Sequence, residues 1–259
     1  MISVTSAQLT AFLAAFAWPA SRILALIASA PVVGNADVPP MLKIALGLLI
    51  TVLVAPLLPT PPQVSPASAD GLLILAQQVL IGLAMGFTMQ AVFHAAEMAG
   101  EFIGLQMGLG FATLYDASVP GMIPIVGQFL GVVVTLAFLS VDGHLMLIST
   151  LVESFRILPL AQLTGPAGMR DMAEWGATIF SFGLALALPL LAALLITNIG
   201  LGVLTRAAPQ LNIFAVGFPL TILVGFIGLT LVVPYFAPTL QQMFMDGLRQ
   251  MLRIAAALR

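Results

Sequence analysis

The sequence predicts an all-α, polytopic integral membrane protein, and three observations support this fold class. Of its 259 residues, 61% are hydrophobic and only 7% are charged, whereas a soluble domain carries about 25% charged residues. The mean hydropathy is +1.14. Six stretches are apolar over most of the length that a helix needs to cross a bilayer. Since so few charges could not cover a water-soluble protein of this size, lipid or a partner subunit must cover much of the surface.

The six long hydrophobic helices are predicted, in order, at residues 8–30, 41–58, 71–95, 123–148, 176–204 and 213–236. The first contains Trp18-Pro19 and Arg22, so we expect it to kink or to lie partly against protein. No basic segment precedes it, and Pro31 follows the weak cleavage pattern Ala28-Ser29-Ala30, so we expect the N-terminus to be retained.

The connections between these helices differ in character. Residues 59–70 are proline-rich and polar, which predicts a loop. Residues 149–175 carry most of the charge in the middle of the chain and predict a polar connection with short helical pieces, and 239–259 predict a last helix. With no tandem repeat and no second soluble domain, we expect a single membrane domain over residues 1–259 that includes a glycine-rich loop at 104–124.

Charge and cysteine content exclude several classes of function. The net charge is −2, so nothing indicates nucleic acid binding, and the absence of cysteine removes disulfides, thiolate catalysis and cysteine-type metal sites. With six spans, the side that carries both termini holds five cations, Arg156, Arg170, Arg249, Arg253 and Arg259, against Lys43 and Arg206 on the other. Because cations concentrate on the cytoplasmic side, we expect cytoplasmic termini.

Small residues recur every four positions through residues 94–124. Ala96, Gly100, Gly104 and Gly108 form one smooth stripe on a helix, and Gly82 and Gly86 repeat the pattern upstream. Such a stripe lets another backbone approach closely, and ordinary helix packing explains it as well as a special role does. Irregular backbone within the membrane is tolerated only against protein or a watery cavity. The glycines and prolines that follow therefore predict a segment that faces a pore or a partner; they are Gly108, Gly110, Pro120, Gly121 and Pro124.

Three ionisable residues share one face of the same helix. His94, Glu97 and Glu101 stand at i, i+3 and i+7, a spacing that suits pairing within a bundle, a proton relay along a translocation path, or metal ligation. We expect no metal site, because no second Glu-x-x-His motif and no cysteine accompany them. Later in the chain, Asp142-Gly143-His144 reads as a polar turn at the end of the fourth span, without a nucleophile to make a catalytic pair.

The segment Arg206–Pro219, RAAPQLNIFAVGFP, joins the last two spans. Pro209 ends one helix and Asn212 suits the N-cap of the next. Together with other motifs, this segment carries a family resemblance. The most specific elements are Pro209-Gln210-Leu211-Asn212-Ile213-Phe214 with Gly217-Phe218-Pro219; Gly100-Glu101 and Gln106-Met107-Gly108, with Phe111-Ala112 and Asp116; and Gly143-His144 with Ser154-Phe155.

Through these motifs the whole chain resembles the FliR family, the R subunit of the flagellar type III protein-export gate, which is related to an injectisome subunit. The Gly-Phe-Pro ending favours the flagellar branch. The resemblance implies a bacterial inner-membrane, multi-pass protein of the flagellar basal body that is required for flagellum assembly. It implies assembly with P- and Q-type subunits into a helical funnel, contacts with a B-type switch protein, an A-type export ring protein and the basal-body MS ring, and passage of unfolded flagellar proteins. It implies no cofactor and no enzymatic activity.

The resemblance also implies roles for particular residues. The glycine-rich loop would form part of a channel plug, with Gly104, Leu105, Met107, Gly108, Gly110, Phe111, Asp116, Pro120 and Gly121. Packing between subunits would involve Gly82, Gly86, Gly100, Glu97, Glu101, Pro209, Gln210, Asn212 and Phe214. Two alternatives stay open from the residues alone. One is a proton-coupled secondary transporter using Glu97, Glu101, Asp116 and His144, although we find no inverted repeat. The other is an intramembrane hydrolase, for which no nucleophile pattern exists.

Overall fold

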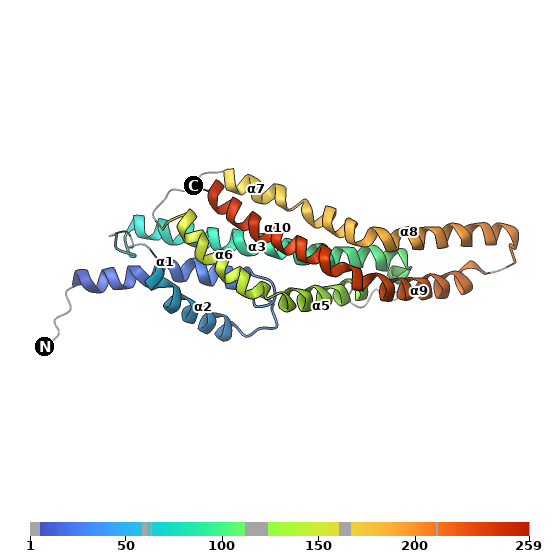
Figure 1. The fold of residues 1–259 in the computed structure, drawn as a ribbon, viewed down its shortest axis with the longest axis horizontal. Coiled ribbons are helices and arrows are strands. Elements are labelled where there is room, and N and C mark those ends of the chain that lie inside the picture. The colour runs from blue at the N-terminus through green and yellow to red at the C-terminus, as the bar shows by residue number, and fades with distance from the viewer. Residues whose placement is uncertain are drawn as a thin grey trace. The chain divides into compact units, whose positions relative to one another are not determined.

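The computed structural model describes residues 6–58, 62, 64–111, 124–160, 167–210 and 212–258, with the backbone alone at 6–13, 111, 167, 213 and 214. All regular structure in these residues is helical, which confirms the predicted fold class (Figure 1). The α-helices are α1 (Ser6–Ser29), α2 (Pro40–Val54), α3 (Ala69–Gln106), α5 (Ile125–Ser140), α6 (Gly143–Ile157), α7 (Ala167–Trp175), α8 (Thr178–Ala207), α9 (Ile213–Val232) and α10 (Phe236–Ala257). Short 3₁₀ turns are η1 (Ala55–Leu57), η2 (Leu109–Phe111) and η3 (Val233–Tyr235).

The helices gather into two compact units. Unit 1 contains Met1–Ala91, Asp142–Gly176 and Phe244–Arg259, and unit 2 contains Val92–Val141 and Ala177–Met243. Two helices, α3 and α10, contribute to both units. Both units consist of helices within the described residues, and the prediction of a single membrane domain stays a prediction.

A buried arginine lies at the centre of unit 1. The side chain of Arg22 in α1 is fully buried and donates from Nε to Gln78 Oε1 at 2.8 Å. Its Nη1 donates to Ser154 Oγ at 3.2 Å and its Nη2 to the carbonyl of Leu158 at 2.9 Å. The guanidinium lies 4.2 Å from the centre of the Phe155 ring. As expected, α1 lies against protein at this point, and the buried cation is solvated by acceptors from α3 and the end of α6.

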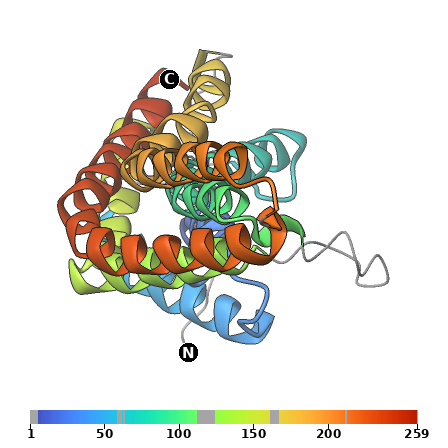
Figure 2. The same cartoon turned by 90° about the vertical axis from the view of Figure 1, so that its right-hand side faces the viewer.

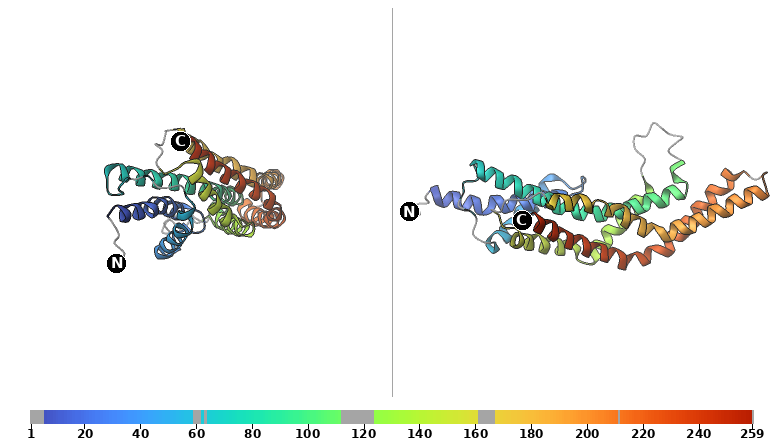
Figure 3. Two further views of the ribbon diagram at one scale, coloured as in Figure 1. Left: turned by 60° about the vertical axis from the view of Figure 1, so that its left-hand side comes forward. Right: turned by 90° about the horizontal axis from the view of Figure 1, so that it is seen from above.

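Two glycines of α3 bring this helix close to α1. A Cβ on Gly82 would meet the Arg22 carbonyl oxygen and lie 2.8 Å from Ala25 Cβ. On Gly86 it would meet the Ser29 hydroxyl and lie 2.8 Å from Ser29 Cβ. The upstream small residues therefore serve the close approach of two helices within this chain. On another side of α1, α2 folds back and packs through Gly47 against Leu24 (Figure 3, left).

In unit 2, α8 and α9 form an antiparallel hairpin (Figures 1 and 2). Gly228 of α9 makes room for the Leu190 side chain of α8. A Cβ on Gly183 of α8 would lie 2.9 Å from the carbonyl oxygen of Ala95, so α8 also approaches α3 closely. Glycines thus set the spacing of the helix pairs that surround the second half of α3.

The number of helices that could cross a membrane differs from the six predicted. By length and composition, four described segments qualify: Pro40–Leu57, Ala69–Gln106, Gly168–Ala207 and Ala215–Ala257. The first predicted stretch, 8–30, corresponds to α1, Ser6–Ser29, whose part with described side chains is the shorter apolar helix Ala14–Ser29. The fourth, 123–148, is divided between α5 and α6, which meet at a 69° bend and make a fifth span only if counted together.

The bend between α5 and α6 has a local cause. Asp142 adopts a left-handed backbone conformation with φ of 55°, and non-glycine residues that do so are mostly asparagine or aspartate. The Asp142 carbonyl accepts hydrogen bonds from the N–H groups of Leu145 and Met146, which starts α6. The predicted polar turn at Asp142-Gly143 is present. It does not end one long helix, however, but joins two shorter ones.

The last helix differs from the others in what it exposes. Every large hydrophobic side chain of residues 236–258 is at least partly covered, whereas α2, α3, α5, α8 and α9 all expose several. The exposed side of α10 carries Gln241, Gln242, Arg249 and Arg253 instead. Since glutamine and arginine are costly to place in hydrocarbon, we expect the outer face of α10 to contact water or a polar partner.

Candidate functional site

The small-residue stripe of α3 continues into unit 2, where it meets α5. A Cβ on Gly100 would lie 2.5 Å from Gly127 Cα and 2.6 Å from its backbone nitrogen. The two helices therefore touch backbone to backbone at Gly100 and Gly127, as the stripe predicts for one neighbouring helix. The next stripe residue is less crowded, because a Cβ on Gly104 would lie 3.6 Å from Val126, which is an ordinary contact.

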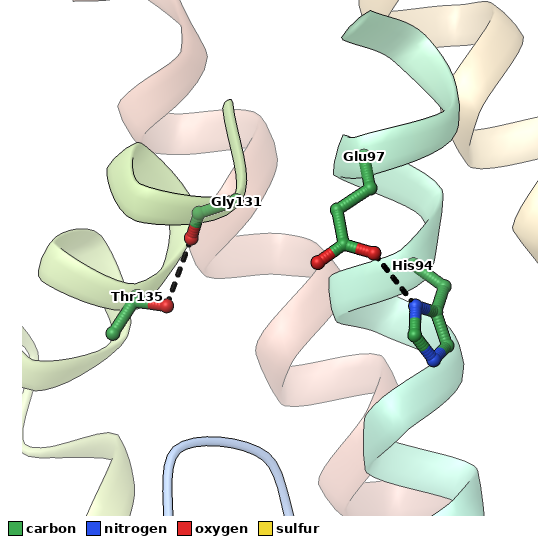
Figure 4. A network of polar contacts seen from close by, with 4 residues as sticks. All are labelled: His94, Glu97, Gly131 and Thr135. Carbon is green, nitrogen blue, oxygen red and sulfur yellow. Dashed lines mark hydrogen bonds and ion pairs between the residues drawn. The ribbon is translucent and has the colours of Figure 1, made fainter. Parts of the chain in front are cut away.

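The ionisable face of α3 lies beside this crossing. His94 Nδ1 and Glu97 Oε2 are 2.8 Å apart, and both side chains are nearly half exposed. The Glu97 carboxylate points toward α5 at Gly131, where an added Cβ would lie 3.2 Å from Oε1 (Figure 4). Thr135 donates its hydroxyl hydrogen bond to the Gly131 carbonyl, at 2.8 Å. Glycine at 131 thus leaves room for a carboxylate between the two helices, and His94 pairs with Glu97 within α3.

The other ionisable residues of the predicted relay are placed differently. Glu101 is exposed on α3, and His144 is exposed near the start of α6, which belongs to unit 1. Asp116 lies outside the described residues. Among the residues that the structure describes, no group of three histidine or acidic side chains is arranged to hold a metal ion.

The predicted glycine-rich loop, 104–124, begins inside α3, because Gly104, Leu105 and Gln106 are still helical. Leu105 is 58% exposed, whereas Met107 is fully buried. Gly108 has φ of +84°, a conformation that glycine adopts without strain, and η2 follows directly. Of the remaining predicted plug residues, Gly110 is half-buried, the side chain of Phe111 is not described, and Asp116, Pro120 and Gly121 lie outside the described residues.

The end of α3 is held by α9. The Thr221 hydroxyl, which is buried, donates to the Met107 carbonyl at 3.0 Å. An added Cβ on Gly225 would lie 2.5 Å from Cγ and Sδ of Met107, so the methionine side chain occupies the space that this glycine leaves. One residue further along, an added Cβ on Gly108 would lie 2.8 Å from the ring of Phe218.

Thr221 and Gly225 are not among the predicted site residues. They stand four residues apart in an apolar helix and follow Gly217-Phe218-Pro219 directly. A small residue one turn after a threonine marks a face that accepts another chain segment closely. That spacing was the available signal, but it does not tell which segment packs there.

An apolar groove lies beside the same elements. It has a volume of about 490 Å³ and separates the start of α5 from the end of α9 and η3. Its lining consists of Ile125, Val126, Phe129, Phe226, Leu229, Thr230, Val233 and Pro234. The hydroxyl of Thr230 donates to the Phe226 carbonyl at 2.9 Å, so the groove offers little polar chemistry.

The predicted motif between the last two spans forms the turn from α8 to α9. Pro209 and Gln210 are exposed. Asn212 directly precedes α9, and its carbonyl accepts from the N–H groups of Ala215 and Val216, as expected for the residue at the N-cap. The side chain of Phe214 is not described. Contact of these residues with other subunits stays a prediction.

Comparisons with known proteins agree over nearly the whole chain. Residues 13–247 match the family described as Bacterial export proteins, family 1. The chain is 42% identical over 247 residues to the flagellar biosynthetic protein FliR of Escherichia coli K12, covering 95% of this chain and 94% of that protein. It is 44% identical over 249 residues to FliR of Pectobacterium carotovorum, with the same coverage. FliR of Bacillus subtilis is 30% identical over 210 residues, 80% of this chain and 81% of that protein. These relatives give no support to the transporter alternative.

Proposed function

Because the chain belongs to the FliR family of bacterial export proteins and is a membrane-embedded subunit of the flagellar export apparatus, we propose that it helps to form the export gate itself. In this proposal it assembles with P- and Q-type subunits in the bacterial inner membrane, at the flagellar basal body. The assembly passes unfolded flagellar proteins and contacts a B-type switch protein, an A-type export ring protein and the MS ring. The chain binds no cofactor and catalyses no reaction.

Residues 104–124 are the part of the chain that we propose as the channel plug. A gate wide enough for an unfolded chain must be filled when it is closed, or ions would leak through it. Apolar side chains suit that task because they exclude water, and methionine adapts to irregular space. Leu105 is exposed and available for contacts outside this chain, while Met107 is buried within it.

One observation carries the plug proposal. The residue directly after α3, Met107, is held by Thr221 of α9, and the next residue is a glycine with a left-handed backbone. Gly108 therefore turns the chain out of the helix axis at a defined point within the glycine-rich segment. This arrangement supports a segment that leaves a rigid scaffold abruptly, as a plug attached to a channel wall must.

The proposal is tested by deleting residues 112–119, which leaves η2 and Pro124 in place. The deletion is made in the assembled complex, in cells otherwise able to build flagella. We expect assembly to continue, with the membrane becoming permeable to ions and small dyes. The matched control replaces residues 112–119 with a flexible linker of equal length, which should leak less than the deletion. A complex that assembles with the deletion and remains tight contradicts the plug assignment.

A further inference from the structure

The end of α3 is attached to α9 by a hydrogen bond to its backbone and by the packing of one side chain. The hydroxyl of Thr221 shares its single hydrogen between two acceptors, the Phe218 carbonyl of its own helix, at 3.1 Å, and the Met107 carbonyl at the end of α3, at 3.0 Å. The Met107 N–H is already used, because it donates to the Ile103 carbonyl at 2.9 Å. The Met107 carbonyl lies at the C-terminal end of α3, where carbonyl groups lack partners within the helix. Thr221 supplies a partner for one of them.

The side chain of Met107 is held by contacts other than the hydrogen bond to its carbonyl. Met107 is fully buried, and its Cγ, Sδ and Cε atoms all fall within 2.6 Å of where a Gly225 Cβ would stand. Any larger residue at 225 must displace the thioether. Thr221 and Gly225 are one helical turn apart, so a single face of α9 grips both the backbone and the side chain of Met107.

The contact of α9 with Met107 lies directly before Gly108, where the chain leaves the helix. It therefore affects more than the packing of two helices. Gly108 follows Met107 immediately, turns the chain through its positive φ, and faces the ring of Phe218. Met107, at the end of α3, is thus attached to α9, and the chain changes direction at the first residue beyond it. Phe218, Thr221 and Gly225 lie at i, i+3 and i+7, on one side of α9.

We propose that Thr221 and Gly225 are positioning residues that fix the point where the glycine-rich segment leaves the scaffold. This inference rests on the proposed function of residues 104–124. Thr221 and Gly225 do not themselves fill the channel. They determine where the segment starts, and a plug is useful only if its base is in register with the opening that it fills. What matters at 221 is a hydroxyl donor, and what matters at 225 is the absence of a side chain.

The first measurement tests directly whether α9 holds residue 107. The chain has no cysteine, so Met107→Cys places a single thiol at the gripped position in the assembled complex. We expect slow modification of this thiol by a maleimide. Thr221→Val keeps the shape of threonine but removes the donor, and should raise the labelling rate roughly fivefold, the effect of losing one ordinary hydrogen bond. Thr221→Ser retains the donor and should label slowly.

The second measurement is the leakage of ions through the membrane, made in complexes that keep Met107. Thr221→Val and Gly225→Ala should make the membrane leaky to ions, and Thr221→Ser should restore tightness. Gly200→Ala is the matched glycine control, because an added Cβ there meets nothing within 4 Å. It should be tight.

The outcomes separate this inference from the proposed function. If Thr221→Val leaves the rate of thiol labelling unchanged, α9 does not hold the end of α3, whatever the ion leakage of that complex. Faster labelling in a tight complex, when the deletion of 112–119 leaks, overturns the positioning role and leaves the plug standing. A deletion that assembles without leaking removes the plug and this inference together.

Discussion

At the scale of single residues, the pairing of His94 with Glu97 decides between a conducting and a structural role. The carboxylate lies against α5 in the space left by Gly131, and its other oxygen meets the imidazole at 2.8 Å. Both side chains are nearly half exposed, so water can reach them and the pair adds at most about 1 kcal/mol to stability. A residue wedged between two helices is better suited to fixing their separation than to carrying protons through a gate.

We therefore expect Glu97→Gln to be mild and to act on assembly. Glutamine keeps the size of glutamate and can still bond His94, so the α3–α5 spacing should be preserved. The amount of assembled complex should fall by less than about twofold, as expected for the loss of a partly exposed ion pair. Export and ion leakage, measured per assembled complex, should stay unchanged. A variant that assembles fully but loses export would restore the relay hypothesis.

At the scale of helices, the members of the α3 stripe are not equivalent. Gly100 touches the backbone of α5, while Gly104 has room for one more carbon. A backbone contact cannot be relieved by a rotamer change, so a methyl group at 100 must push the two helices apart. A methyl group at 104 only makes an ordinary contact with Val126.

This difference predicts opposite results for two similar substitutions. Gly100→Ala should destabilise the chain by about 1–3 kcal/mol, the usual effect of overpacking. Gly104→Ala should be neutral or slightly stabilising, since alanine favours helix by up to about 1 kcal/mol. The check is the thermal stability of both variants in the purified complex. Equal stability of the two would mean that α3 and α5 do not cross at Gly100.

The apolar helices could be predicted because their hydrophobic runs are long, but their limits could not. The predicted third span ended at residue 95, whereas α3 continues to Gln106, because His94, Glu97 and Glu101 share one face and leave the other faces apolar. The break at Asp142 depends on one backbone angle, to which hydropathy is insensitive. The hydrogen bond from Thr221 to Met107 was not predictable either, since it joins residues 114 positions apart.

At the scale of the whole molecule, the number of membrane spans decides which cations lie on each side of the membrane. With the four long segments alone, Lys43 moves to the side that carries both termini, together with Arg156, Arg170, Arg249, Arg253 and Arg259, and Arg206 stays on the other. If α5 and α6 together form a fifth span, the termini separate, and the side of the C-terminus holds five cations against three on the other side, Arg22, Lys43 and Arg206. Six spans also give five against two. Every arrangement places the C-terminus on the cation-rich side.

We therefore expect a cytoplasmic C-terminus in all cases. A reporter that is active only in the cytoplasm should work when fused after Arg259, and one that needs the periplasm should not. The same pair of reporters at the N-terminus separates the arrangements, because only five spans put that end in the periplasm. Periplasmic activity after Arg259 would show that the cation bias misleads in a chain with only eight cations.

The buried position of Arg22 has a consequence for how the chain is made. Its three acceptors follow 56, 132 and 136 residues later in the sequence. At ordinary rates of synthesis the ribosome needs on the order of ten seconds to reach Leu158. During that time the guanidinium has been made but has no place in a core, and an arginine is costly in lipid. The first helix must wait in water, at the interface or within the insertion machinery. In stalled chains, a cysteine at Ile23 should therefore react until synthesis passes Leu158, and earlier protection would contradict this order.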